Sequence, residues 1–261
     1  MHLIDTHSHI YLPEFDADRA EMVARARSAG VKFVVLPNID STTTERLHAT
    51  QEQFPDFCYP LIGLHPTSVK DDYQHELTHL EEQLNQHAYS GIGEIGIDLY
   101  WDKTFLSEQK YVFEYQVDIA IKLNLPIIIH CRESFAEITS SLAHFDAKKL
   151  KGIFHSFTGT PDEAAKIFSA GDFKLGINGI ITYKNATFAQ QLQHIPLSAI
   201  VLETDAPYLT PVPNRGKRNE PSYVPFVVRK LSEIYQQTEE KIAAITSKNA
   251  CQVFPNLPCT I

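Results

Sequence analysis

Short apolar runs alternate along this chain with longer stretches in which apolar residues recur every three or four positions. Several runs are continuously apolar, which is typical of strands buried on both faces of a sheet. The glycines at positions 91 and 93 predict that neighbouring backbones approach closely there. The predicted strands cover 3–4, 33–36, 61–64, 91–95, 126–129, 152–154, 173–177 and 200–202.

The amphipathic stretches between these runs predict helices. Gly30 is placed to end the first of them, and Ser107 is placed to cap the N-terminus of a long one. Thr160 and Glu163 have the spacing of a capping box, with Pro161 in the first turn. The predicted helices cover 15–29, 43–54, 76–86, a long stretch from 107, 134–145, 161–170, 188–193, 224–236 and 239–251.

About eight strand-then-helix units predict an α/β fold, a (β/α)8 TIM barrel in which residues 1–261 form one domain. The alternative is an open doubly wound sheet, which usually carries a glycine-rich phosphate-binding turn after its first strand. Here that position holds His7 and His9. The barrel is therefore favoured, and its catalytic residues are expected at the C-terminal ends of the strands.

Histidine and carboxylate residues follow the apolar runs directly. His7 and His9 are two residues apart on an extended segment, so both side chains point the same way and can bind one ion. One such residue is usually structural, but seven at the same place in the repeat indicate a metal site. Other histidines, among them His48, His79 and His87, are expected at the surface. The strand-end residues are His7, His9, His65, Glu94, His130, His155 and Asp205.

These donor types predict which metals bind. Imidazole and carboxylate without thiolate suit Zn²⁺, Mn²⁺ or Mg²⁺. More ligands converge than one tetrahedral ion needs, so we expect two divalent metal ions bridged by the two oxygens of Glu94. Asp205 is also the candidate general base. One ion is expected to bind His7, His9, Glu94 and Asp205, and the other to bind Glu94, His130 and His155.

Composition narrows the class of protein further. A net charge of −9 disfavours a general nucleic-acid coat, so an anionic substrate would need local cations or metal ions. Without a CxxC pair, Cys58, Cys131, Cys251 and Cys259 are expected to be reduced thiols in a cytoplasmic protein. No signal peptide, membrane span or obligate protein partner is indicated.

Seven motifs follow one another over nearly the whole chain. They are Asp-Thr-His-Ser-His at 5–9, Gly-Leu-His-Pro at 63–66, Gly-Glu-Ile-Gly-Ile-Asp at 93–98, His-Cys-Arg-Glu at 130–133, His-Ser-Phe-Thr-Gly at 155–159, Leu-Glu-Thr-Asp-Ala-Pro-Tyr at 202–208 and Arg-Gly-Lys-Arg-Asn-Glu-Pro at 215–221. In content and order they resemble the TatD-type metal-dependent deoxyribonucleases, within the amidohydrolase-like TIM barrels.

The resemblance implies a TIM barrel, a divalent-metal phosphodiesterase and DNA as the substrate. Some members of the family lack the first histidine pair, and its presence here favours a full two-metal site. Independently of the resemblance, Asp98 and Glu203 are candidates to orient the ligand imidazoles. The ligands that the resemblance implies are His7, His9, Glu94, His130, His155 and Asp205.

Four residues near these motifs are candidate substrate contacts, each with a structural alternative. His65 would contact phosphate or orient a ligand, or bond to the backbone. Arg132 would pair with a phosphate, or with Glu133 or another carboxylate. Tyr100 and Trp101 would stack on a nucleobase, worth ~1–3 kcal/mol, or pack beneath a loop.

A basic loop is expected after the eighth strand. Four prolines, one glycine and no helical period predict a long ordered loop at 206–221 on the catalytic face. Arg215, Lys217 and Arg218 crowd into it although the protein is acidic. We expect them to bind substrate phosphate, and the alternative is a basic turn paired with acidic residues such as Glu220.

Three functional hypotheses follow. The leading one is a metal-dependent deoxyribonuclease, an exonuclease on single-stranded ends, because an acidic surface with a confined cationic pocket suits an enzyme that takes one terminus. The second is an amide or ester hydrolase, such as a deacylase or cyclic amidase, on the same scaffold. The third is a non-catalytic metal-binding protein, which the complete ligand set with Asp205 disfavours.

Overall fold

The strands of this protein form a closed barrel in its computed structural model, which describes residues 1–259. Every strand pairing is parallel, and two ladders run in sequence order, β1 to β3 and β4 to β8. The strands are β1 (Leu3–Asp5), β2 (Val31–Leu36), β3 (Cys58–Pro60), β4 (Ile92–Asp98), β5 (Ile127–Arg132), β6 (Lys151–Phe154), β7 (Asp172–Ile177) and β8 (Ile200–Leu202).

Two isolated parallel bridges join the ladders into a ring. Ile62 pairs with Ile92 between the third and fourth strands, and Ser8 pairs with Ala206 between the first and eighth. The predicted TIM barrel is therefore confirmed, and the open sheet is excluded. The third strand is displaced from its predicted position, because the ladder to β2 is made by residues 58–60 and the segment 61–64 forms only the single bridge at Ile62.

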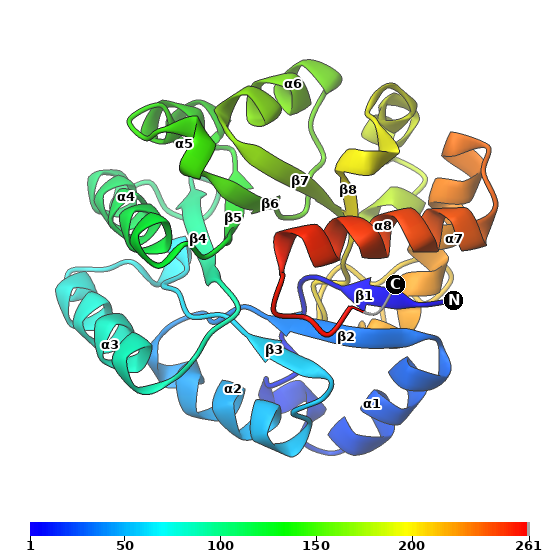
Figure 1. Ribbon diagram of the computed structural model, residues 1–261, viewed down its shortest axis with the longest axis horizontal. Coiled ribbons are helices and arrows are strands. Elements are labelled where there is room, and N and C mark those ends of the chain that lie inside the picture. The colour runs from blue at the N-terminus through cyan, green and yellow to red at the C-terminus, as the bar shows by residue number, and fades with distance from the viewer. Residues whose placement is uncertain (260–261) are drawn as a thin grey trace.

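Helices surround the strands, as Figure 1 shows. The α-helices are α1 (Arg19–Ser28), α2 (Ser41–Gln53), α3 (Tyr73–Gln86), α4 (Leu106–Leu123), α5 (Phe135–Leu142), α6 (Pro161–Ala170), α7 (Val224–Tyr235) and α8 (Glu239–Val253). Short 3₁₀ helices cover Pro13–Phe15, Pro66–Ser68, Ala147–Lys149, Gly179–Thr182, Thr187–His194, Leu197–Ala199 and Pro221–Tyr223. In residues 1–259, no helix is long and apolar enough to cross a membrane.

Helix ends were predicted with mixed success. The capping box at Thr160 is confirmed, since its hydroxyl accepts from the Glu163 backbone N–H and the Glu163 carboxylate accepts from the Thr160 N–H. Ser107 does not cap its helix, because α4 begins one residue earlier, after Phe105. The first helix begins at Arg19 and not at Phe15, which belongs to a separate 3₁₀ turn.

The barrel interior is filled with aliphatic side chains. Ile4, Val35 and Ile128 are buried together with the corresponding residues of other strands, and Phe254 and Leu257 pack onto them after α8 ends. Figure 1 shows α8 and the segment that follows it crossing the barrel end that faces the viewer. These residues close the end of the barrel opposite to the catalytic face.

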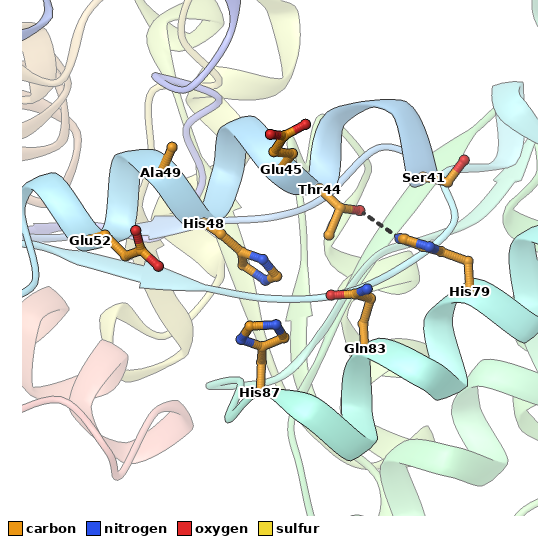
Figure 2. A pocket seen from close by; sticks show the side chains of 9 residues that line it. All are labelled: Ser41, Thr44, Glu45, His48, Ala49, Glu52, His79, Gln83 and His87. Atoms are coloured by element: carbon orange, nitrogen blue, oxygen red, sulfur yellow. Dashed lines mark hydrogen bonds between the residues drawn. The ribbon is translucent and has the colours of Figure 1, made fainter.

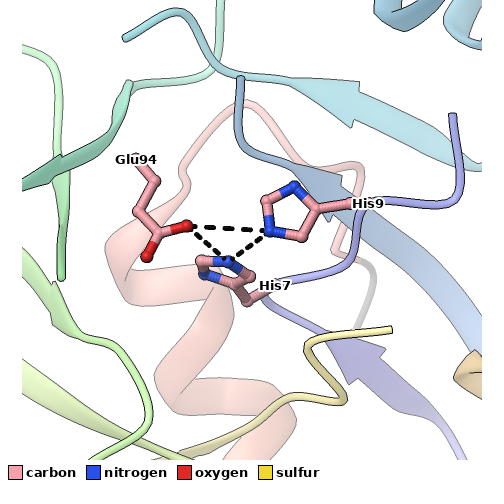
Figure 3. A group of neighbouring side chains, drawn as sticks. All are labelled: His7, His9 and Glu94. Carbon is pink, nitrogen blue, oxygen red and sulfur yellow. Dashed lines mark hydrogen bonds and ion pairs between the residues drawn. The ribbon is translucent and has the colours of Figure 1, made fainter. Parts of the chain in front are cut away.

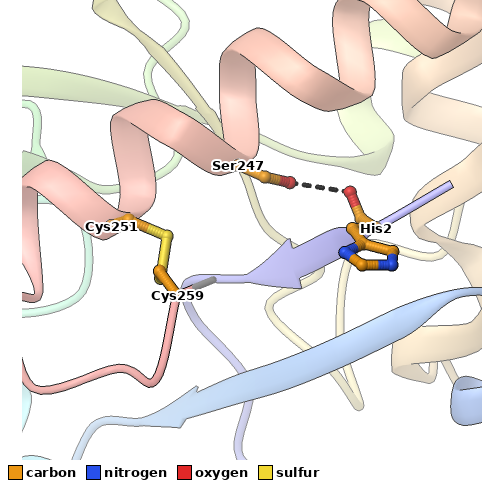
Figure 4. Close-up of a disulfide and its surroundings, with 4 residues drawn as sticks. All are labelled: His2, Ser247, Cys251 and Cys259. Carbon is orange, nitrogen blue, oxygen red and sulfur yellow. Dashed lines mark hydrogen bonds between the residues drawn. A yellow bond between two sulfur atoms is a disulfide. The ribbon is translucent and has the colours of Figure 1, made fainter. Parts of the chain in front are cut away.

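A disulfide holds this C-terminal segment, and it corrects the expectation of four reduced thiols. Cys251 on α8 is bonded to Cys259, eight residues later. Figure 4 shows the bond beside the Ser247 hydroxyl, which donates to the backbone carbonyl of His2 at 2.8 Å. Cys58 and Cys131 are free thiols, as expected. The sequence did not predict the pair because no CxxC spacing marks it, and the chain must fold back after α8 to bring the two cysteines together.

Candidate functional site

The strand-end residues converge at the C-terminal end of the barrel. His7 and His9 follow β1, while Glu94 lies inside β4 with its side chain buried. His130 is on β5, and the three remaining members, His65, His155 and Asp205, follow β3, β6 and β8. Figure 3 shows His7 and His9, from the segment after β1, pointing toward Glu94 of β4. The fold therefore brings together residues as far apart in sequence as 7 and 205.

One group of donor atoms has the spacing of ligands around a single ion. The Nε2 atoms of His7 and His9 lie 3.1 Å apart, and Glu94 Oε2 is 3.1 Å from the first and 3.6 Å from the second. Asp205 Oδ1 is 3.6 and 3.5 Å from the same two nitrogens. A tetrahedral ion with bonds of 2.0–2.1 Å separates its ligands by about 3.3 Å. These atoms therefore fit a divalent ion.

The tautomer of His9 supports this fit. The Tyr11 hydroxyl donates to the backbone carbonyl of Pro37 at 2.7 Å, so its oxygen must accept from His9 Nδ1 at 2.9 Å. The proton of neutral His9 is then on Nδ1, and the lone pair of Nε2 faces Glu94. The lone pairs of His9 Nε2 and of the Glu94 carboxylate therefore face each other without a proton between them. A cation bound there would remove the resulting repulsion.

A second group surrounds the other oxygen of Glu94. Its Oε1 lies 2.8 Å from His130 Nδ1, 3.5 Å from His65 Nε2 and 4.0 Å from His155 Nε2. The sequence placed His130 and His155 here, and the structure adds His65 as a close neighbour of the same oxygen. Glu94 therefore stands between two sets of imidazoles, one at each oxygen.

His65 differs from the other imidazoles in its proton. Its Nδ1 accepts from the backbone N–H of Thr67 at 3.2 Å and lies 2.7 Å from the Thr67 hydroxyl, which can donate to the same nitrogen, so the neutral ring carries its proton on Nε2. That N–H points toward the site and can donate to a carboxylate or phosphate oxygen, but it has no lone pair for a metal ion. The His65 side chain is 14% exposed.

Two carboxylates lie beside the imidazoles of His130 and His155. Asp98 Oδ2 lies 2.8 Å from His130 Nε2, and Glu203 Oε1 lies 3.0 Å from His155 Nδ1. Glu203 also accepts from the side-chain amide of Asn178 at 3.1 Å. Gly176 makes room for it, because a Cβ at that glycine would lie 2.0 Å from Glu203 Oε2.

The charges in the site are strongly coupled. Burial alone would raise the pKa of Glu94, but His7, His65 and His155 hold that pKa well below its usual range. Burial alone would lower the pKa of His155, but the carboxylates of Glu203, Glu94 and Asp205 raise it to about 10. The cluster therefore has ionised carboxylates and attracts positive charge, whether a proton or a metal ion.

The backbone at the rim of the site is strained at three residues. Glu133, Ser156 and Asp205 have φ values of 54°, 51° and 57°, and they follow β5, β6 and β8. Residues other than glycine rarely adopt this left-handed conformation, and such strain is concentrated at functional sites. The pattern is independent of the side-chain chemistry and points to the same end of the barrel.

Arg132, Tyr100 and Trp101 form a cluster at the edge of the site. The guanidinium carbon of Arg132 lies 3.9 Å from the ring centre of Tyr100 and 5.4 Å from that of Trp101. Among residues 1–259, no ion pair joins Arg132 to Glu133 or to another carboxylate. The expected internal ion pair is therefore replaced by a stacking contact, and the expected phosphate contact of Arg132 stays a prediction.

The basic loop is ordered, but its three cations differ. Arg215 and Lys217 are exposed, and the Arg215 guanidinium lies 4.3 Å from the ring centre of Tyr183. Arg218 is half-buried and makes a bidentate ion pair with Asp18 at 2.7 and 2.8 Å. The expected substrate role of Arg218 is therefore corrected, because both terminal nitrogens of its guanidinium group already donate to Asp18.

A separate hollow of about 520 Å³ lies between α2 and α3. Figure 2 shows His48, His79 and His87 lining it together with polar residues of both helices. It contains none of the strand-end residues. These histidines are on or beside helices, as the sequence indicated, and the hollow is distinct from the candidate site.

Sequence reasoning missed three residues that hold the site together. Tyr11 fixes the tautomer of His9, and Asn178 holds Glu203. Asp5 is fully buried and accepts from the Thr204 hydroxyl at 2.6 Å, which ties the end of β1 to the end of β8. Asp5 and its partner Thr204 lay inside recognised motifs. Tyr11 and Asn178 did not, and they are identified by contacts that arise only in the folded chain.

Comparison with known proteins supplies independent information. The family described as TatD related DNase matches residues 4–255. A Bacillus subtilis protein named as an uncharacterized metal-dependent hydrolase, YabD, is 38% identical over 253 residues, and the match covers 97% of this chain and 98% of that relative. A protein of Edwardsiella piscicida named as a 3'-5' ssDNA/RNA exonuclease is 32% identical, with coverage of 92% of this chain and 95% of the relative.

A solved structure has the same fold over the same length. The crystal structure of YjjV, a TatD homologue from Escherichia coli K12, superposes with a TM-score of 0.90 at 28% sequence identity. The match covers 97% of this chain and 98% of that one. The sequence and structure comparisons therefore agree along almost the entire chain.

Proposed function

This chain belongs to the family of TatD-related deoxyribonucleases and is a metal-dependent hydrolase, and from that premise we propose that it is an exonuclease on single-stranded DNA ends. The relatives named as 3'-5' ssDNA/RNA exonucleases support this choice of substrate. We include in the proposal two divalent ions, Zn²⁺, Mn²⁺ or Mg²⁺, because the donors are imidazole and carboxylate.

One observation carries the proposal. Glu94 directs one oxygen toward the Nε2 atoms of His7 and His9 and the other toward His130 Nδ1 and, more distantly, His155 Nε2. A carboxylate shared by two donor sets is the arrangement of a two-metal phosphodiesterase. Divalent ions held there would activate a water molecule and neutralise the negative charge that develops on phosphate.

This geometry supports an assignment of ligands. One ion would be held by His7, His9 and one oxygen each of Glu94 and Asp205. The other would be held by the second Glu94 oxygen with His130 and His155, while His65 would serve as a hydrogen-bond donor through Nε2. Asp98 and Glu203 orient the two imidazoles of the second ion.

Asp205 is the proposed general base. Its Oδ1 faces His7 and His9, and its Oδ2 lies 3.8 Å from His155 Nε2, so the carboxylate borders both donor sets. The side chain is partly accessible, whereas Glu94 is almost completely buried. An oxygen of Asp205 can therefore take a proton from a water molecule that attacks phosphorus between the two sets.

Substrate binding falls to groups around this centre. The His65 Nε2–H can donate to a nonbridging phosphate oxygen, and the exposed Arg215 and Lys217 can hold phosphates farther along the strand. These cations lie in the loop after β8, and Tyr183, on which Arg215 stacks, lies in the loop after β7. Barrel enzymes often bind phosphate with these two loops.

The test is hydrolysis of end-labelled oligonucleotides by protein reconstituted with each ion in turn. Single strands labelled at either end and a blunt duplex are compared with a panel of acyl, amide and lactone substrates. We expect release of mononucleotides from single strands and loss of activity with a chelator. Hydrolysis of the acyl or amide panel without cleavage of DNA would overturn the proposal in favour of a deacylase or cyclic amidase.

A further inference from the structure

Two large aromatic side chains are exposed beside the site. Trp101 is 68% exposed and Tyr100 is 50% exposed, and their rings meet edge to face at 4.9 Å between centres. Arg132 lies over both rings. We call Tyr100, Trp101 and Arg132 the aromatic platform. Apolar area of this size in water is costly, so its exposure at a catalytic rim indicates a binding surface.

The platform is attached directly to the site through Asp98. Asp98 Oδ1 accepts the backbone N–H groups of Tyr100 and Trp101 at 2.9 and 3.2 Å, while its Oδ2 lies 2.8 Å from His130. Asp98 and Arg132 are also paired in register between β4 and β5. The buried carboxylate of Asp98 therefore fixes both the backbone of Tyr100 and Trp101 and the imidazole of His130.

On the basis of the proposed function, we propose that the aromatic platform stacks on an unpaired nucleobase next to the scissile phosphate and thereby selects single-stranded ends. A flat π-face accepts any base, so this contact gives strand selectivity without sequence selectivity. In a duplex each terminal base is paired and stacked on its neighbour, and it would have to be freed before it could reach the rings.

The contacts of Arg132 with two adjacent rings favour a base over a phosphate as its partner. A guanidinium that lies at 3.9 Å over Tyr100 has one face covered, and the rings restrict its plane. In that position it extends the stacking surface and can donate from its edge to a base. Arg215 and Lys217, which are also exposed and lie in the loop after β8, are left for the phosphates.

Trp101 is the only tryptophan of the chain, so its fluorescence reports on this surface alone. The metal-loaded full-length protein is titrated with a phosphorothioate oligothymidylate that resists hydrolysis. A sugar-phosphate chain of the same length without bases, and a blunt duplex, are titrated in parallel. We expect the single strand to reduce the emission at least twofold, and the abasic chain and the duplex to change it little.

Kinetics provide a second readout that a purely structural role would not change. We expect Trp101→Leu to raise KM for the single strand about tenfold with kcat nearly constant, because removing one base–aromatic stack lowers affinity by roughly 5- to 150-fold. Trp101→Phe should recover most of this affinity. Tyr111→Ala is the matched control, since Tyr111 is 53% exposed on α4 and packs against Tyr73 and Tyr115.

The outcomes separate this inference from the proposed function. Equal quenching by the base-containing and abasic chains, or an unchanged KM in Trp101→Leu, overturns the platform while leaving DNA hydrolysis intact. Absence of DNA hydrolysis together with absence of quenching means that the proposed function itself is wrong. A tenfold effect of Tyr111→Ala would also overturn the inference, because the effect would then not be specific to the platform.

Discussion

The partner of one histidine nitrogen determines what the other nitrogen can do. His9 donates from Nδ1 to Tyr11 and so presents a lone pair to the site, whereas His65 accepts at Nδ1 from Thr67 and presents a proton. The two rings look equivalent in sequence, since each follows an apolar run. Their different chemistry is fixed by backbone and side-chain contacts that only the folded structure supplies.

The second donor set can be removed while all four residues of the first set are kept. His130→Ala combined with His155→Ala should lower the metal content of the purified protein from two ions to one, because the two sets share only Glu94. Elemental analysis with circular dichroism measures both metal and fold. His48→Ala with His87→Ala, in the hollow between α2 and α3, is the matched control and should retain two ions. Unchanged metal content in the first variant would contradict the assignment.

Asp205→Asn should reduce kcat far more than it changes KM. The side chain acts on the water molecule and not on the substrate, and general-base contributions are ~10²- to 10⁴-fold. Because Asp205 is also an assigned ligand, turnover must be compared at equal metal occupancy. Wild-type turnover at full occupancy would remove Asp205 from the mechanism.

At the scale of the residue, the sequence predicted which side chains meet, but not all of their partners. His7, His9 and Glu94 converge as expected because strand ends of a barrel share one face. Arg218 was expected to bind substrate but pairs with Asp18, which is 200 positions away in sequence. No local sequence pattern predicts a contact between residues so far apart. Whether Arg218 binds substrate or an internal carboxylate can therefore be decided only from the folded structure.

At the scale of the element, buried strands were predicted better than helix ends. The apolar runs of β2, β5, β7 and β8 mark segments that are mostly buried, so the pattern alone identifies these strands. Helix starts depend on single hydrogen bonds. The capping box at Thr160 has a strong sequence signature, but α4 begins after Phe105, where no side-chain cap is present and no signature exists.

The loop after β8 should bind substrate through its two exposed cations. Arg215→Ala with Lys217→Ala is expected to raise KM for an oligonucleotide and to flatten its dependence on salt. Each phosphate that is no longer neutralised should reduce the log–log salt slope for a single strand by ~0.7. Hydrolysis rates measured over a series of salt concentrations provide the slope, and an unaltered KM and slope would refute the role of the loop.

Arg218→Ala should instead lower stability. The guanidinium of Arg218 and that of Arg25 hold the pKa of Asp18 well below its usual range. A depressed carboxylate pKa contributes stability above the unfolded value, about 4, and the contribution disappears as pH falls through the folded value. We expect stability to fall by about 1 kcal/mol at pH 7 in urea unfolding, an effect that shrinks below about pH 4. A large rise in KM with unchanged stability would contradict this division of roles.

At the scale of the whole molecule, the barrel separates the site from the elements that close its opposite end. The site lies where β1 and β8 are tied by Asp5 and Thr204. At the other end, Phe254 and Leu257 cover the aliphatic interior after α8. Mutations in the C-terminal segment should therefore change stability without changing the geometry of the metal ligands.

The disulfide between Cys251 and Cys259 tests this separation. It closes a loop with a sequence separation of eight, for which loop-closure entropy predicts about 2–3 kcal/mol of stability. Cys251→Ser with Cys259→Ser should lower the free energy of unfolding by that amount, and the wild type in reductant should behave like the variant. Metal content and kcat should stay unchanged, because the bond holds the segment that covers the end of the barrel farthest from Glu94. Release of bound metal from the variant at a temperature where it remains folded would show that the two ends are coupled.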